Sequence, residues 1–216
     1  MKWKRFSLMA AFVFALPPMS AKANSFQDNL LTLIRKVGVH GNVGVRHPTN
    51  SNVTRGVTFG PSVGLSPGQS NGWKYPVALS MFSQDFHSAN GTKFASVRTR
   101  AIMAGIGYGW HFGQLSVGPQ VEVGYTFNHA SLNGDAPGAF DIPGTVTMKV
   151  DNAWVIRPEF KAEYFITPKV TFRTSVDYVR LRPGITVITP AGPVADHWIM
   201  SNVHANVGVG FYPFRK

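Results

Sequence analysis

The sequence predicts an all-β protein: an eight-stranded antiparallel up-and-down transmembrane β-barrel that follows a short N-terminal helix. Eight segments alternate apolar residues with small or polar ones, as strands with two different faces do. The links between the segments alternate between short and long, which is typical of bacterial barrels. The 216 residues include no cysteine, so an exported chain would depend on a core or a closed sheet rather than on disulfides.

Residues 1–23 have the features of a signal peptide. The basic start consists of Lys2, Lys4 and Arg5. An apolar run over 6–16 follows, and it is too short to span a bilayer as a helix. Small residues before the expected cleavage point suit a signal peptidase, so we expect cleavage after Ala23. An uncleaved N-terminal anchor is the alternative.

Residues 24–36 and 37–216 form the two remaining parts of the expected domain organisation. After Ser25, apolar residues recur near helical spacing, which predicts a short helical segment over 24–36. The rest of the chain, 37–216, is expected to form the outer-membrane barrel.

The eight expected strands differ in how clean their alternation is. They cover about 37–46, 55–65, 74–84, 94–110, 115–127, 146–165, 170–179 and 199–211. The segment 146–165 alternates most clearly, whereas 94–110 is the poorest fit. There, Arg98 and Arg100 have the parity of the apolar residues. We therefore expect a β-bulge within 99–104.

Link lengths and aromatic residues set the orientation of the expected barrel. The links 111–114 and 166–169 are short and 66–73 is a somewhat longer turn, whereas the other four links run over about 47–54, 85–93, 128–145 and 180–198. Short turns are periplasmic and long loops extracellular in such barrels. Aromatic residues gather at the periplasmic ends of the strands: Trp73, Tyr75, Tyr108, Trp110, Phe112, Phe165, Phe211, Tyr212 and Phe214. We expect an aromatic girdle there, formed by Trp73, Tyr75, Tyr108, Trp110 and Phe211.

Over about residues 37–214 the chain resembles the small eight-stranded outer-membrane barrels of the OmpA and OmpX type. The resemblance lies in strand number, loop order and girdle rather than in a motif. It implies a monomer in the bacterial outer membrane, in contact with membrane lipid and lipopolysaccharide, and inserted by the outer-membrane assembly machinery. Such barrels usually end on an aromatic residue, whereas here Arg215 and Lys216 follow Phe214.

The formal net charge of +11 indicates an anionic partner or a solvated basic surface. Four of these charges lie in the signal peptide, which leaves about +7 on the mature chain. Because an exported protein rarely meets nucleic acid, the phosphates of lipopolysaccharide are the expected partner. Arg180 and Arg182, at the outer end of the expected strand 170–179, are the expected contacts.

Charged residues with inward parity predict a barrel-interior network. Its expected members are Glu122, Arg157, Glu159, Lys161, Glu163, Arg173 and Asp177. Arg46, Lys74, Arg98 and Arg100 could also point inward. Eight strands leave an interior filled by side chains. The network is therefore either a polar core of paired charges or a narrow ion path.

His129 and Ser131 are the only candidate catalytic pair. Two residues apart on one strand face, the histidine could take the serine proton. The pair resembles the His-x-Ser-Asn pattern of lipid A deacylases. Asn133 is displaced by one position, however, and Asp135 or Asp141 would have to supply the acid.

No cofactor or metal site is expected, because the seven histidines are scattered. The expected role is structural or a surface interaction through the extracellular loops, such as envelope integrity, adhesion or ligand contact, and not an enzyme or a wide pore. Two alternatives stay open: a lipid hydrolase using His129 and Ser131, and a soluble periplasmic lipocalin-like barrel. The lipocalin-like barrel would place apolar side chains inside and polar ones outside.

Overall fold

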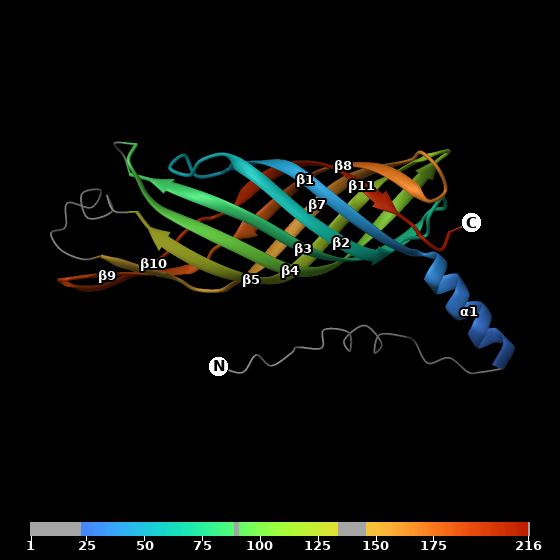
Figure 1. Ribbon diagram of the computed structural model, residues 1–216, viewed down its shortest axis with the longest axis horizontal. Helices are drawn as coiled ribbons and strands as arrows, with labels where there is room; N and C mark the ends of the chain where they lie inside the picture. The colour runs from blue at the N-terminus through green and yellow to red at the C-terminus, as the bar shows by residue number, and fades with distance from the viewer. Residues whose placement is uncertain (1–22, 89–90, 134–145, 216) are drawn as a thin grey trace.

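A computed structural model describes residues 23–88, 91–133 and 146–215 (Figure 1). The expected signal peptide, apart from Ala23, lies outside these residues. The chain order is α1 (Ala23–Arg35), β1 (Val37–Pro48), β2 (Gly56–Leu65), β3 (Gly72–His87), β4 (Lys93–Phe112), β5 (Leu115–Leu132), β6 (Thr147–Val150), β7 (Ala153–Phe165), β8 (Val170–Leu181), β9 (Gly184–Thr189), β10 (Gly192–His197) and β11 (Asn202–Phe211). Among the described residues, no helix is both long enough and apolar enough to cross a bilayer.

Eight of the strands close into one antiparallel barrel, which confirms the predicted fold class. The order around the barrel is β1-β11-β8-β7-β5-β4-β3-β2. The first and last strands close it, with Val43 opposite Val207 of β11 and opposite Phe59 of β2. Figure 1 shows α1 and the C-terminus at the same end of the barrel, which we call the periplasmic end. The opposite end is called the extracellular end.

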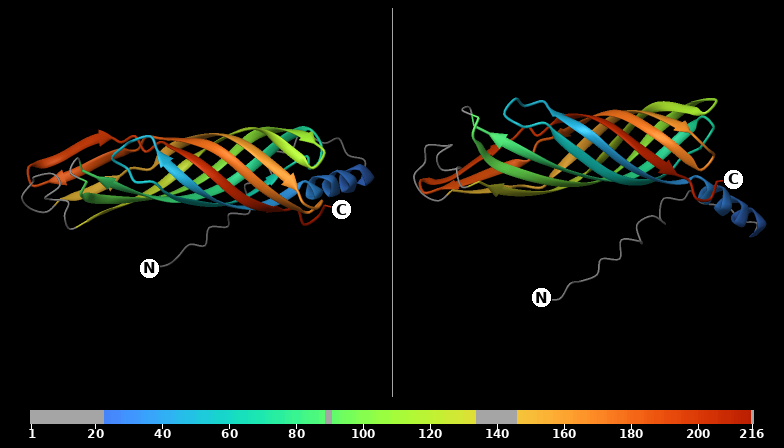
Figure 2. Two further views of the ribbon diagram at one scale, coloured as in Figure 1. Left: turned by 90° about the horizontal axis from the view of Figure 1, so that it is seen from above. Right: turned by 45° about the horizontal axis from the view of Figure 1, so that its top comes forward.

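Three short strands outside the barrel were not predicted. They form a sheet in the order β10-β9-β6, which we call the outer sheet. It extends beyond the barrel at the end opposite α1 (Figure 2). The prediction of one strand over 146–165 is therefore wrong, because β6 belongs to the outer sheet and the chain enters the barrel only after Asp151 and Asn152. Hydrogen bonds hold this break: the Asn128 amide nitrogen donates to Asn152 Oδ1 at 3.0 Å, and its side chain donates to the Asp151 carbonyl at 2.8 Å.

The predicted bulge within 99–104 is also wrong. β4 keeps one register with β5 through this stretch, from Thr99 opposite Asn128 to Ala104 opposite Val123. Arg98 and Arg100 consequently face outward with the apolar residues of their parity, and both are exposed. The expectation that they could point inward fails for the same reason.

The outward face of the barrel is apolar along most of its length. Near the periplasmic end, Trp73 packs edge-to-face on Tyr108 at 5.3 Å between ring centroids, and Tyr108 on Trp110 at 5.6 Å. A second aromatic group near the extracellular end brings Tyr125 within 5.6 Å of both Phe127 and Trp154. Apolar side chains outside and charges inside are the reverse of what the lipocalin-like alternative requires.

Two aromatic residues of the periplasmic cluster face inward instead. Phe165 and Tyr212 are fully buried and stack on each other at 5.9 Å. A side chain at Gly38 would meet the Tyr212 ring at 2.5 Å, so a glycine at this position admits the ring into the barrel mouth. These two residues close the periplasmic end from within.

Most of the extracellular half of the interior is an apolar core, which surrounds a small buried polar group of Arg46, Gln84 and Asn202. The buried members of the core are Val53, Ala78, Phe82, Phe86, Phe94, Ala95, Val97, Ala101, Met103, Val150, Val155, Val179, Leu181, Ile185 and Met200. Trp198, after β10, packs on Phe86 with 4.4 Å between ring centroids. Links and outer sheet therefore contribute to one core with the barrel strands.

Candidate functional site

The periplasmic half of the interior holds all seven residues of the expected charge network. Glu122, Glu159, Lys161, Glu163, Arg173 and Asp177 are buried, and Arg157 is half-buried. β5 supplies Glu122, β7 supplies the four residues from Arg157 to Glu163, and β8 supplies Arg173 and Asp177. Because alternate residues of a strand face the same side, the one-residue alternation of β7 directs its four charges into one interior.

Glu163 is the centre of the first charge cluster, close to the periplasmic end. Its Oε1 accepts hydrogen bonds from the hydroxyls of Thr171 and Tyr212, each at 2.9 Å. Lys74 Nζ lies 3.5 Å from its Oε2, and Arg173 Nε lies 4.0 Å from its Oε1. Burial, together with the nearby carboxylate, raises the pKa of the Tyr212 phenol, so this hydroxyl stays protonated as a donor.

A second cluster lies one layer further in, between β5 and β7. Gln120 is its hub: its amide donates to Glu122 at 2.6 Å and to Glu159 at 2.9 Å, and its carbonyl accepts from Lys161 at 3.0 Å. Lys161 also pairs with Glu159 at 3.4 Å, and Arg157 forms an ion pair with Glu122. Gln120 shares the inward parity of Glu122, but as an uncharged residue it was not among the predicted members of the network.

Most of the described interior charges have an opposite charge beside them, whereas the buried Arg46 donates to uncharged oxygens, Asn202 Oδ1 and the carbonyls of Thr54 and Ser83. Two spaces among these side chains measure about 20 Å³ each, room for about one water molecule. The apolar core and the buried Arg46, Gln84 and Asn202 occupy the extracellular half. This packing is that of a polar core and offers no support for an ion path.

At the extracellular end of the outer wall, Arg180 and Arg182 line a groove. Both side chains are exposed, at the end of β8 and directly after it. The groove has a volume of about 650 Å³, and Trp154, Ile156 and His197 also line it. The guanidinium groups of Arg180 and Arg182 thus share the groove with the aromatic Trp154 and the aliphatic Ile156.

His129 and Ser131 lie exposed on the outward face of β5, also at the extracellular end. Ser131 Oγ donates to the Ser96 carbonyl at 3.4 Å, and His129 stands opposite Arg98. The Ser96 hydroxyl donates in turn to Asp85 at 2.6 Å. Asp135 and Asp141 lie outside the described residues. The described structure therefore supplies the pair with a cationic neighbour rather than with an orienting acid.

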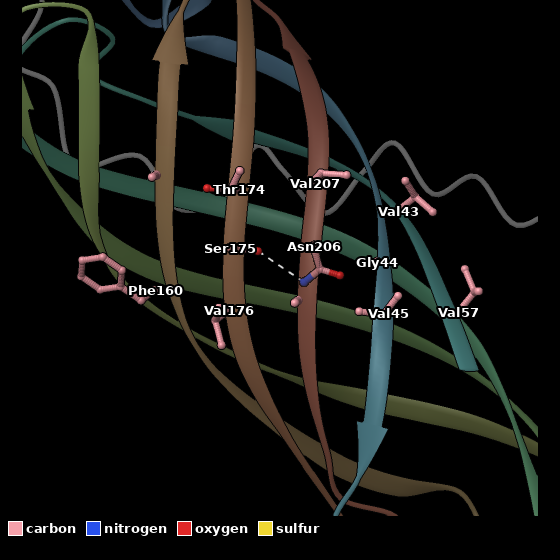
Figure 3. Close-up of a pocket in the computed structure, with 12 residues that line it drawn as sticks. Val43, Gly44, Val45, Val57, Phe160, Thr174, Ser175, Val176, Asn206 and Val207 are labelled. Carbon is pink, nitrogen blue, oxygen red and sulfur yellow. Dashed lines mark hydrogen bonds between the residues drawn. The ribbon is translucent and has the colours of Figure 1, made fainter. Parts of the chain in front are cut away.

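A hollow with a mostly apolar lining lies in the outward-facing wall of the barrel (Figure 3). Its volume is about 660 Å³, and small residues such as Gly44, Ala162 and Ala205 line it between the larger Phe160 and Val57. Figure 3 shows Asn206 and Ser175 hydrogen-bonded at 3.3 Å on β11 and β8. The hollow offers apolar surface, as a wall in contact with acyl chains does.

No group of three or more metal-binding side chains occurs among residues 23–88, 91–133 and 146–215. The two spaces between the interior charges are each smaller than a cofactor requires.

No protein-family model matches the chain, and no curated protein matches it in sequence. Its fold is similar to that of the outer membrane protein OprG from Pseudomonas aeruginosa, with 13% identity and a TM-score of 0.65 over 81% of this chain and 94% of that one. Neisserial surface protein A is similar with 15% identity and a TM-score of 0.53, over 82% of this chain and 97% of the other. A major outer membrane protein from Thermus thermophilus shares 10% identity with a TM-score of 0.50, over 81% and 98%. The chain has the fold of the small eight-stranded outer-membrane β-barrels.

Proposed function

We propose that this chain is a monomeric outer-membrane protein that acts at the cell surface through its extracellular end. A cleaved signal over residues 1–23 would export it, and the outer-membrane assembly machinery would insert it. The outer sheet carries the proposal, because it extends beyond the lipid-facing wall and presents exposed apolar residues. Ile188 is 49% exposed and Val194 61% exposed. Exposed apolar residues on a projecting surface favour contact with another molecule.

The filled interior supports an interaction role over transport. Paired charges occupy the periplasmic half, and an apolar core with the buried Arg46 and its hydrogen-bond partners occupies the extracellular half. Arg180 and Arg182 would contact the phosphates of lipopolysaccharide, since both are exposed cations at the rim of a groove that Trp154 and Ile156 also line.

The test removes the hairpin β9–β10 and keeps all eight barrel strands, although it also takes Ile185 out of the apolar core. The Trp198 amide donates to the Pro183 carbonyl at 3.1 Å, so the ends flanking 184–197 are adjacent and a Gly-Gly link can join them. We expect the shortened protein to reach the outer membrane but to give cells no more surface attachment than cells without the protein. Full attachment by cells with the shortened protein would contradict the role of the outer sheet.

A point substitution separates the surface from the length of the hairpin. Ile188→Asp places a charge on the exposed face of β9, while Phe214→Asp places one on an equally exposed apolar residue at the periplasmic end. Attachment should fall for the first variant only. An equal fall in both would indicate a general effect of added charge.

A lipid hydrolase is the second candidate, because His129 and Ser131 share the outward face of β5 at its extracellular end. The test compares lipid A acyl chains by mass spectrometry in cells with the native protein, with Ser131→Ala and with neither. The surface role predicts three identical profiles. Acyl loss that depends on Ser131 would establish the hydrolase instead.

A further inference from the structure

The outward arginines of β4 form a cluster with a histidine of β5. Arg98 and Arg100 are two residues apart on one strand face, which separates their Cα atoms by about 7 Å. Arg98 stands opposite His129, and Arg100 stands opposite Phe127. All three basic side chains are exposed on the barrel wall. We call them the β4–β5 basic cluster.

The cluster stands at the upper edge of the apolar band. Toward the periplasm from Arg100, the outward residues of β4 are Ile102, Ala104, Ile106, Tyr108 and Trp110. The span from Arg100 to Trp110 is about 33 Å along the strand, or about 25 Å along the barrel axis at a tilt of about 40°. The apolar band of outer-membrane barrels is also about 25 Å tall. Trp110 and Arg100 therefore mark its two edges, and Arg100 lies at the depth of lipid headgroups.

Within the described residues, neither arginine side chain has a carboxylate partner. The nearest acid in the strand register is Asp85, opposite Ser96. Lys93 pairs with that carboxylate at 2.9 Å, and Ser96 donates to it at 2.6 Å. Because two unpaired cations at the edge of a lipid phase gain from a counter-ion, the position favours an anion carried by the lipid itself.

We propose that Arg98, Arg100 and His129 bind the phosphate group of an outer-leaflet lipid. Guanidinium groups match phosphate oxygens in two-point hydrogen bonds, and two of them can share one phosphate. The acyl chains of that lipid lie along Ile102 and Phe127, directly below the cluster. The proposal rests on the outer-membrane location and is independent of the outer sheet and of Arg180 and Arg182.

The test measures lipid retained by the purified, refolded barrel. The barrel is incubated in neutral detergent micelles with bisphosphorylated lipid A or with dephosphorylated lipid A, and retained lipid is counted by native mass spectrometry. The variant is Arg98→Gln with Arg100→Gln. The matched control, Arg35→Gln with Lys36→Gln, removes two exposed charges at the periplasmic end. A gel comparison of unboiled and boiled samples shows that each variant is folded.

We expect the β4 double variant to retain about tenfold less phosphorylated lipid A, which corresponds to about 1.4 kcal/mol. The control should retain as much as the native barrel, and dephosphorylated lipid A should bind weakly to all three. Competition by millimolar inorganic phosphate alone would show that the site recognises free phosphate and would overturn the lipid assignment. Equal retention by the β4 double variant and the native barrel would overturn the site. Neither result depends on attachment, so the proposed surface role stands or falls separately.

Discussion

The two halves of the barrel interior differ in chemistry: ion pairs dominate the periplasmic half, whereas apolar side chains surround the one neutral-partnered cation, Arg46, in the described extracellular half. Toward the periplasmic end, Glu163 gathers Lys74, Arg173 and two hydroxyls. Toward the extracellular end, Met103 and Leu181 lie in a core without charges among its members. The same strands build both halves.

The outward face changes from apolar to polar at the level where the interior changes from charged to mostly apolar. On β8, Phe172 and Val176 face out where Arg173 and Asp177 face in, whereas Arg180 faces out where Leu181 faces in. Where lipid surrounds the wall, the outside is apolar and the inside can hold paired charges. Where water surrounds the wall, apolar side chains are stabilised only when they are buried in the barrel interior, as in a soluble protein. The barrel thus has apolar side chains outside and charges inside toward the periplasmic end, and the reverse arrangement toward the extracellular end.

Removing the carboxylate of Glu163 should have the largest effect on this arrangement. Glu163→Ala leaves Lys74 and Arg173 buried without their anion, which costs about 3–5 kcal/mol. Urea unfolding in detergent, followed by the shift between folded and unfolded gel bands, measures this loss. Glu163→Gln keeps an acceptor for Tyr212 and should lose less. Equal urea midpoints for native protein and Glu163→Ala would show that the polar half does not depend on this charge.

Truncation in the apolar half comes next. Leu181 is fully buried, so Leu181→Ala should cost about 3 kcal/mol through lost burial and the cavity it leaves. Val176→Ala, on the lipid-facing side of the same strand, is the matched control and should cost much less. The same urea titration compares them. If both variants lost the same stability, the extracellular half would lack the packed core described above.

The smallest expected effect concerns the extracellular aromatic group. Trp154 is 72% exposed and contacts Tyr125 edge-to-face, so Trp154→Ala should cost about 1 kcal/mol. Trp154→Phe keeps a ring and should retain part of that stability in the same titration. A loss as large as that of Leu181→Ala would mean that Trp154 belongs to the core rather than to the membrane interface.

Alternation in the sequence was enough to predict the closed barrel, since each of its eight strands carries that pattern. It also gave the inward parity of the charges on β7. It did not reveal the outer sheet, because alternation continues through Asp151 and Asn152 although the chain turns away there. The short strands β9 and β10 fell within an expected loop.

The arginines of β4 show a second limit of the pattern. The charges of Arg98 and Arg100 among residues of outward parity predict a bulge that β4 does not contain. β4 is longer than the membrane requires, so its outward face becomes polar above Ile102 without any change of register. The change of parity on β8 also indicates the apolar extracellular core. Val179 and Leu181 follow Asp177 at the same inward parity, so apolar side chains replace charges on the inner face there. Comparing the length of each strand with the thickness of a membrane would have predicted where the outward face becomes polar.

The central claim is a closed barrel in the outer membrane, and heat modifiability tests it most directly. Protein purified from an outer-membrane fraction is run on a denaturing gel with and without boiling. The account predicts a faster unboiled band, because a closed barrel stays compact in detergent until it is heated. A single band, with the protein in the soluble periplasmic fraction, would contradict it.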